Sequence, residues 1–205
     1  MYMTNEQKIL NIIDKNNGYI TSKDIIDESI NHVFLSRMVK KGILEKYSKG
    51  YYGLPSYLPD SYFIVLSKSK YAIYSHSTAL YFHDLSVWTP LNLDITVPNH
   101  YGGVLQKTEN ITLYTVSEDV LNLGMMEMES PLGMNIKVYD MERTICDIIK
   151  AKNKMDAEIF SKALKNYVKR KDKKLSVLFK YSKQLNIEEK VRDYIEVLLW
   201  WIKIN

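Results

Sequence analysis

The chain is poor in cysteine and has no long apolar run. Cys146 is the one cysteine among 205 residues, so no disulfide can form within the chain. We therefore expect the protein in a reducing compartment. No stretch approaches the ~18 consecutive apolar residues that a transmembrane helix needs. The opening MYMTNEQKIL lacks the cationic start and apolar run of a signal peptide. These absences predict a cytoplasmic protein without a membrane partner.

Catalytic motifs are also missing. The chain has no G-x-S-x-G elbow, no P-loop and no G-x-G-x-x-G fingerprint. Asp94 is followed two residues later by Thr96, where a nucleotidyltransferase would place a second carboxylate for paired Mg²⁺ ions. His76 and His83, the latter beside Asp84, would lie about 10 Å apart along a helix, too far to share one metal ion. We therefore expect no enzymatic activity, no metal and no cofactor.

The net charge of +4 conceals a segregation along the chain. Residues 1–56 hold 8 basic and 6 acidic side chains, residues 60–148 hold 5 and 11, and residues 149–185 hold 12 and 3. Such sorting indicates a polyanionic partner for the two ends and not for the middle. For residues 149–185 alone, a lysine-rich helical face exposed to solvent is an equally good explanation.

Three helices and a β-hairpin are predicted within the first 56 residues. The first helix follows Thr4 and ends at Gly18, a short second helix follows Thr21 or Ser22, and the third spans residues 31–41. Strands at residues 43–47 and 51–54 are joined by residues 48–50. This is the order of a winged helix-turn-helix domain, whose third helix enters the major groove of DNA while the hairpin lies along the backbone.

The third helix and the hairpin supply the predicted DNA contacts. Val33, Leu35, Met38 and Val39 are expected near one side of the third helix. With Leu35, Met38 and Val39 turned toward the core, Arg37 is expected to read a guanine edge, because its guanidinium can bond O6 and N7 together. The lysines are expected at phosphates, which position the domain without specifying sequence. The predicted contact residues are His32, Ser36, Arg37, Lys40, Lys41, Lys46, Lys49 and Tyr51, with Lys23, Lys165, Lys169, Arg170 and Lys171 as candidate additions. The alternative is a winged helix used for protein contacts, with its lysines simply solvated.

Residues 57–205 are predicted to form a second, α+β domain, separated by the prolines at 55 and 59. Half-buried strands are expected at residues 93–97 and 111–116, and a hairpin at residues 123–130 and 134–139, together forming a small antiparallel sheet. A C-terminal helical bundle follows. Its helices are predicted at residues 141–150, 156–170, 175–185 and 187–202.

The polar residues at the start of the helix predicted at residues 141–150 are expected to stabilise the fold. Asp140 is placed to cap it, and Arg143 is placed to pair with Glu142 or Asp147. Cys146 lies in an apolar helical pattern, as a core cysteine does.

Six stretches together resemble the AbiEi-type antitoxins, transcriptional regulators paired with a nucleotidyltransferase toxin in phage abortive-infection operons. They are residues 20–24, 34–42, 49–52, 74–83, 96–98 and 138–147. The most specific are SHSTAL, beginning at Ser75, and YDMERT, beginning at Tyr139. The family more often has Gly where this chain has Asp84, a difference that affects one turn.

The resemblance implies two functions, one for each predicted domain. The first domain would bind double-stranded DNA at repeats upstream of its own operon, expected to be inverted, and would repress that operon. The second domain would counteract the toxin in the type IV manner, without a stable complex. Two other functions stay open: a nucleic-acid-processing enzyme using Asp94, Asp140 and Asp147, and an adaptor that binds the toxin directly through the basic helices.

Overall fold

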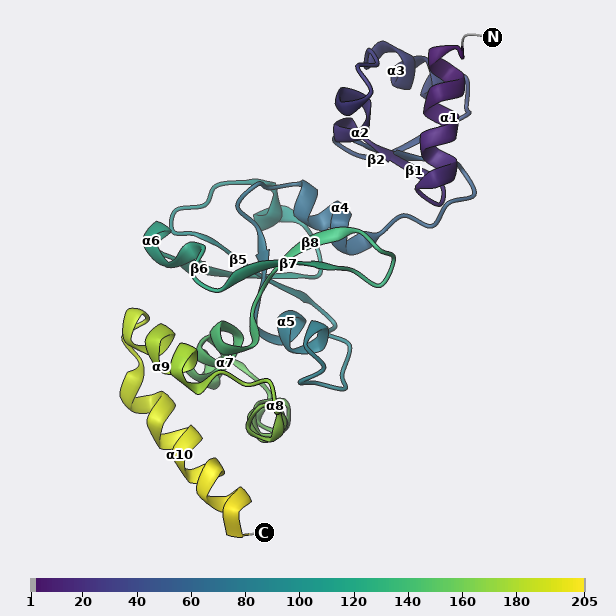
Figure 1. The fold of residues 1–205 in the computed structure, drawn as a ribbon. Helices are drawn as coiled ribbons and strands as arrows, with labels where there is room; N and C mark the ends of the chain where they lie inside the picture. The colour runs from purple at the N-terminus through teal and green to yellow at the C-terminus, as the bar shows by residue number, and fades with distance from the viewer. Residues whose placement is uncertain (1–2, 205) are drawn as a thin grey trace. The chain divides into compact units, whose positions relative to one another are not determined.

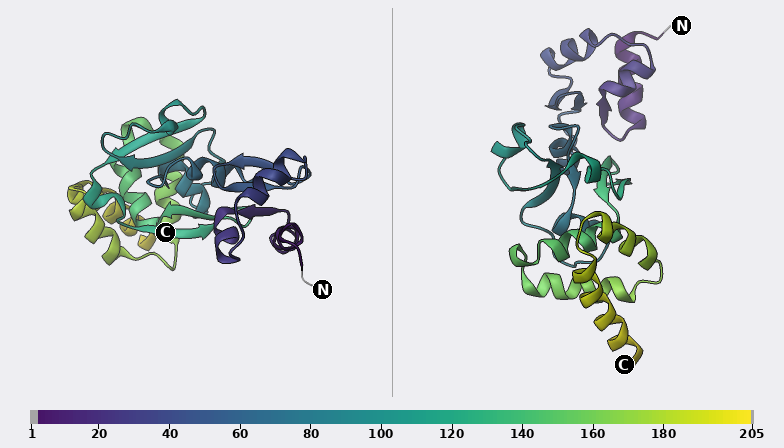
Figure 2. Two further views of the ribbon diagram at one scale, coloured as in Figure 1. Left: turned by 90° about the horizontal axis from the view of Figure 1, so that it is seen from above. Right: turned by 90° about the vertical axis from the view of Figure 1, so that its left-hand side faces the viewer.

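The computed structural model describes the backbone of residues 3–204 and the side chains of residues 3–200 (Figures 1 and 2). The chain forms two compact units: unit 1 comprises the residues up to Lys68 together with Ser130–Met134, and unit 2 comprises Ser69–Glu129 and the residues from Asn135 onward. Both helices and sheets occur, so the predicted α+β class is confirmed. The division expected after residue 56 falls inside unit 1.

Capping side chains begin the first helices of unit 1. In α1 (Asn5–Lys15), Thr4 and Gln7 form a capping box, in which each side chain accepts a hydrogen bond from the other residue's backbone N–H. Thr21 and Asp24 do the same at α2 (Ser22–Asp27). These boxes satisfy N–H groups that the first turn of a helix leaves unpaired.

The third helix, α3 (Val33–Lys40), buries Leu35 and Met38. Val33 was expected on the buried side, but it is 49% exposed, and Phe34 packs against the core instead. Val33 and Leu35 are two positions apart, so a regular helix places them on different sides. The core that these helices share consists of Ile9, Ile13, Ile20, Ile25, Ile30, Leu35, Met38 and Leu44.

A three-stranded antiparallel sheet completes this core. Its order is β1-β3-β2, from β1 (Tyr19–Thr21), β2 (Glu45–Ser48) and β3 (Tyr51–Gly53). Lys46 pairs with Tyr52 and Ser48 with Tyr51, so Tyr47 is an extra residue in β2. A bulge of this kind turns the strand locally and changes which side chains face inward.

Aromatic packing joins the segment after the hairpin to unit 1. Phe63 of α4 (Ser61–Ser67) packs edge-on against Tyr51, with ring centroids 4.9 Å apart. Asp60 caps α4 by accepting hydrogen bonds from the N–H groups of Tyr62 and Phe63, and Ser130 donates its hydroxyl to the same carboxylate. Because both Asp60 and Ser130 are buried, this bond ties residues 130–134 into unit 1.

The sheet of unit 2 is mixed, not antiparallel as expected. Its order is β6-β5-β4-β8-β7. The pairs β5–β6 and β4–β8 are parallel, while β4–β5 and β7–β8 are antiparallel. The strands are β4 (Ile73–Tyr74), β5 (Leu93–Pro98), β6 (Ile111–Val116), β7 (Met125–Glu129) and β8 (Asn135–Tyr139).

Helices cover one face of this sheet. There, α5 (His76–Phe82) packs on β5 and α7 (Met141–Lys150) packs on α5, while the later helices pack on α7 and on one another (Figures 1 and 2). These are α8 (Ala157–Lys169), α9 (Leu175–Gln184) and α10 (Glu188–Ile204). Single-turn elements that the sequence did not predict are η1 (Val104–Lys107), α6 (Glu118–Leu121) and η2 (Lys152–Lys154).

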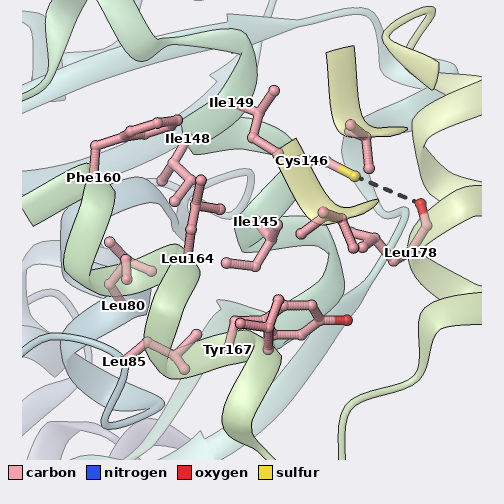
Figure 3. Packing of buried hydrophobic residues seen from close by; sticks show 14 of the residues in the cluster. Leu80, Leu85, Ile145, Cys146, Ile148, Ile149, Phe160, Leu164, Tyr167 and Leu178 are labelled. Carbon is pink, nitrogen blue, oxygen red and sulfur yellow. Dashed lines mark hydrogen bonds between the residues drawn. The ribbon is translucent and has the colours of Figure 1, made fainter. Parts of the chain in front are cut away.

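The main core of unit 2 lies between these helices. Figure 3 shows Leu80 of α5, Ile145 of α7, Leu164 of α8 and Leu178 of α9 converging on one apolar region. Cys146 is buried there with its Sγ 3.7 Å from the Leu178 carbonyl oxygen, so its expected core position is confirmed. Within residues 3–204, no helix combines the length and apolar character needed to cross a bilayer.

Candidate nucleic-acid interface

The helix α3 has one face fixed in the core and one face open to solvent. The Asn31 side chain accepts a hydrogen bond from the Val33 N–H at the start of the helix, and Gly42 follows its end with a φ of +71°. Burial of Leu35 and Met38 sets the rotation of the helix about its axis. The predicted contact residues on and beside this helix that are exposed are His32, Ser36, Arg37, Lys40 and Lys41.

Arg37 is free to form a bidentate contact. Its guanidinium lies 5.6 Å from the centre of the Phe34 ring, an arrangement that restrains the side chain without occupying its N–H donors. Among the residues that the structure describes, no carboxylate forms an ion pair with Arg37. The geometry therefore allows the planar fork that a guanine edge requires.

The lysines around α3 differ in how free they are. Lys41 Nζ lies 2.7 Å from Glu6 Oε1 of α1, so part of its charge is already compensated. Lys46 lies over the Tyr52 ring at 5.9 Å, and Lys49 is exposed in the turn between β2 and β3. Lys46 and Lys49 are consequently better placed than Lys41 to meet a phosphate.

The hairpin turn is held against the start of α2. The Ser22 N–H donates to the Gly50 carbonyl oxygen at 2.8 Å, and Gly50 has a φ of +76°. A Cβ at Gly50 would lie 2.7 Å from Ser22 Oγ, closer than real Cβ atoms come. Lys23, exposed on α2, is thereby brought to the same end of unit 1 as Lys49.

The prediction that Tyr51 contacts a phosphate is wrong. Its side chain is fully buried, its hydroxyl lies 3.1 Å from the Tyr57 hydroxyl, and it accepts a hydrogen bond from the Asp60 N–H. Burial raises the pKa of Tyr51 well above its ordinary value. The residue holds the aromatic cluster together and has no surface to offer DNA.

The basic residues of the C-terminal half belong to unit 2, separate from those of α3. Lys165, Lys169 and Lys171 are exposed. Arg170 makes two hydrogen bonds of 2.8 Å with the Asp172 carboxylate, which lower the pKa of Asp172 to about 2. A guanidinium paired in this way is less available for a phosphate contact than the neighbouring lysines are.

The carboxylates of the enzyme alternative have structural partners. Asp94 Oδ2 accepts from the Ser77 N–H at 2.9 Å, and Asp140 Oδ1 accepts from the Arg143 N–H at 2.8 Å, as expected of a cap. Asp147 Oδ1 lies 2.9 Å from Arg143 Nε, so Arg143 pairs with Asp147 and not with Glu142.

The histidines considered for a metal site also have other partners. His83 Nε2 lies 2.6 Å from the Tyr139 carbonyl oxygen, and His76 is buried against Tyr114. In the part of the chain from residue 3 to residue 204, no group of three or more His, Cys, Asp or Glu side chains could hold a metal ion.

Sequence reasoning missed Glu6, which pairs with Lys41, and Ser22, which carries the hairpin turn. The two members of the Glu6–Lys41 pair are 35 residues apart. No local pattern signals such a contact, since it exists only once α1 and α3 pack together.

Comparisons with known proteins agree with the class of protein inferred above. Residues 7–55 match the family described as transcriptional regulator, AbiEi antitoxin, which confirms the resemblance read from the sequence over that segment. The fold is similar to that in the crystal structure of the RV2827C protein from Mycobacterium tuberculosis, with a TM-score of 0.59 and 10% identity, over 93% of this chain and 74% of that one. At this identity the likeness concerns the fold alone. No curated protein matches the chain.

Proposed function

We propose that the protein is a DNA-binding antitoxin that represses its own toxin–antitoxin operon. In this proposal α2 and α3 form the helix-turn-helix, α3 enters the major groove, and the β2–β3 hairpin is the wing. The observation that carries it is the exposed face of α3, where Arg37 has no acidic partner among the described residues and Lys40 lies one turn further on. The family match at residues 7–55 covers these same elements.

Each exposed residue has a role in the proposed complex. Arg37 reads a guanine, while Lys40, Lys46, Lys49 and Lys23 bind phosphates on either side of the groove. Ser36 and His32 face the groove or its backbone. Two copies side by side would suit inverted repeats upstream of the operon. Such a regulator would work in the cytoplasm.

Toxin neutralisation is assigned to unit 2 by the family resemblance. A nucleotidyltransferase toxin would be opposed without a stable complex. If the chain and the toxin co-purified as a stoichiometric complex, the adaptor alternative would replace this part of the proposal.

The test measures the affinity of the full chain for the DNA upstream of its gene and for a scrambled fragment of equal length, at a series of salt concentrations. Fluorescence anisotropy of the labelled DNA is the readout. We expect tight binding to the upstream fragment alone, with a steep dependence on salt. Lys46→Ala should weaken binding to all DNA alike and reduce the slope of log K against log[salt] by about 0.9. The matched control is Lys15→Ala, an exposed lysine in the last turn of α1, which should leave both quantities unchanged.

Equal affinity for the two fragments would reduce the proposal to non-specific binding. No binding to either fragment would refute the assignment of α3 as a recognition helix.

A further inference from the structure

Two neighbouring cavities in unit 2 are lined by residues of SHSTAL and by residues of the helix that YDMERT begins. The first, of about 330 Å³, is lined by His76 from SHSTAL and by Asp147, which lies in the helix that YDMERT begins. The second, of about 490 Å³, is lined by Trp88 and neighbouring residues. Tyr114 and Lys154 line both cavities, so the two cavities are neighbours that share these side chains.

His76 is held in an unusual conformation at this site. It is buried, has a φ of +45° although it is not glycine, and stacks on the Tyr114 ring with centroids 3.4 Å apart and planes 13° apart. Backbone strain of this kind persists only where the surroundings enforce it, and it clusters at ligand sites.

The ring of His76 is neutral, and one of its nitrogens lies against a pair of hydroxyl groups. Burial lowers the pKa of His76 to about 3, so the ring is neutral at physiological pH. The Thr96 hydroxyl donates to Ser75 Oγ, and Ser75 Oγ lies 2.9 Å from His76 Nδ1.

Asp147 contributes an acceptor that the protein leaves unused. It is 4% exposed, and its Oδ1 accepts from Arg143. Its Oδ2 is buried and has no hydrogen-bond partner among the described residues. Because an unpaired buried carboxylate oxygen is costly, a donor supplied by a ligand would stabilise it.

The first cavity carries an excess of positive charge. Lys150 and Lys154 are both exposed and both line it. The Arg143–Asp147 pair is neutral overall, which leaves the two lysines to attract an anion.

The second cavity suits a planar, less polar group. Its walls include Trp88, Pro90 and Ile159, and Lys162 lies over the Trp88 ring at 5.8 Å. The carboxylates of Asp94 and Asp156 also line it, and both accept backbone hydrogen bonds as caps. Those two charges disfavour an anion here and direct it to the first cavity.

We propose that this site binds a nucleoside phosphate. The base lies in the second cavity against Trp88 and Tyr114, the phosphates lie in the first at Lys150 and Lys154, and a sugar hydroxyl donates to Asp147 Oδ2. The site lies wholly within unit 2 and requires neither DNA binding nor the toxin.

The experiment is calorimetric titration of the full chain with ATP, GTP, CTP and UTP, and with pyrophosphate alone. We expect saturable binding of at least one triphosphate, weakened about tenfold or more by Lys154→Ala, as loss of a charge-assisted contact implies. Lys107→Ala, which removes an exposed lysine of η1, is the matched control and should bind as the wild type does. Arg37→Ala should also bind normally, which separates this site from the DNA interface.

A second variant tests the acceptor. Asp147→Asn replaces Oδ2 with a donor while its remaining oxygen can still accept from Arg143, so it should weaken triphosphate binding. If thermal unfolding shows that Asp147→Asn is not folded, Lys154→Ala alone decides.

Absence of binding at millimolar triphosphate would overturn the proposal, as would equal affinity of Lys154→Ala and Lys107→Ala. Pyrophosphate binding as tightly as the best triphosphate would overturn the base-binding half, because the second cavity would then contribute nothing.

Discussion

Arg37 is the residue on which sequence recognition depends in the proposed interface. Arg37→Ala should cost about 1–3 kcal/mol on the preferred operator and relax the preference at one base position. Competition binding with operators substituted one base at a time measures this. Lys40→Ala, one turn away on the same exposed face, is the comparison and should weaken all operators alike. A uniform loss for Arg37→Ala would mean that it contacts a phosphate.

Glu6 restrains the proposed interface, because its carboxylate lies 2.7 Å from Lys41 Nζ. Glu6→Gln should release Lys41 and strengthen binding to any DNA, by an amount within the ~0.2–1 kcal/mol range of exposed ion pairs, with a larger gain at low salt. Anisotropy at two salt concentrations is the measurement. Asp14→Asn removes an exposed carboxylate elsewhere on α1 and separates the release of Lys41 from the general change in charge. An equal gain in both variants would show that Lys41 is not involved.

For individual residues, the sequence predicts burial and exposure where these follow from helical periodicity. Burial of Leu35 and Met38 follows from their spacing, and the exposure of Arg37 and Lys40 follows with it. Tyr51 could not be placed, because its burial depends on Tyr57 and Phe63 of the segment that follows the hairpin, and strand alternation does not show that this segment packs there. Neither did any local pattern reveal that Asp147 would retain an unpaired oxygen.

Among the elements, the β2–β3 hairpin depends on Gly50. Gly50→Ala should destabilise unit 1, because the residue has a φ of +76° and the new Cβ would lie 2.7 Å from Ser22 Oγ. Gly42→Ala is the matched control: its φ is +71°, but a Cβ there has no neighbour within 4 Å.

Strain from positive φ costs about 1 kcal/mol in either variant, so the larger loss in Gly50→Ala measures the packing of the turn on α2. Urea unfolding gives both values, and DNA affinity should fall further for Gly50→Ala. Equal losses would mean that Ser22 simply moves aside.

The longer elements were predictable, whereas their pairing in the larger sheet was not. Apolar periodicity gives Met141–Lys150 and Ile111–Val116 directly. The alternation of apolar and polar residues in a strand does not show whether neighbouring strands run parallel, because that depends on the segment that joins them. Residues 99–110 join β5 to β6 and are long enough for the crossover that parallel pairing needs.

At the scale of the whole molecule, we expect the free energy of unfolding to depend on pH through His76. Its pKa is about 3 in the folded state and about 6.5 when unfolded, so between these values only the unfolded chain takes up the proton. Acidification from pH 7 to pH 5 should therefore remove about 2 kcal/mol of the free energy of unfolding through this group. Burial raises the pKa of Asp147, which acts in the opposite direction.

Comparison with His76→Gln separates the effect of His76 on stability from that of Asp147, because the variant loses the imidazole and keeps the carboxylate. The difference in unfolding free energy between wild type and variant should shrink by about 2 kcal/mol from pH 7 to pH 5 in urea titrations. A difference independent of pH would mean that His76 is protonated as easily in the folded chain as in the unfolded one.

Unit 1 is not one continuous stretch of chain, because Ser130–Met134 belongs to it and Ser130 bonds to the buried Asp60. A gene fusion that transferred only residues 1–68 to another protein would leave that carboxylate buried without its hydroxyl donor. Recombination at a single breakpoint cannot move the complete unit. Units 1 and 2 are therefore expected to be inherited together. If the proposed function holds, an exchange of operator specificity between relatives is expected to proceed by point substitutions on α3.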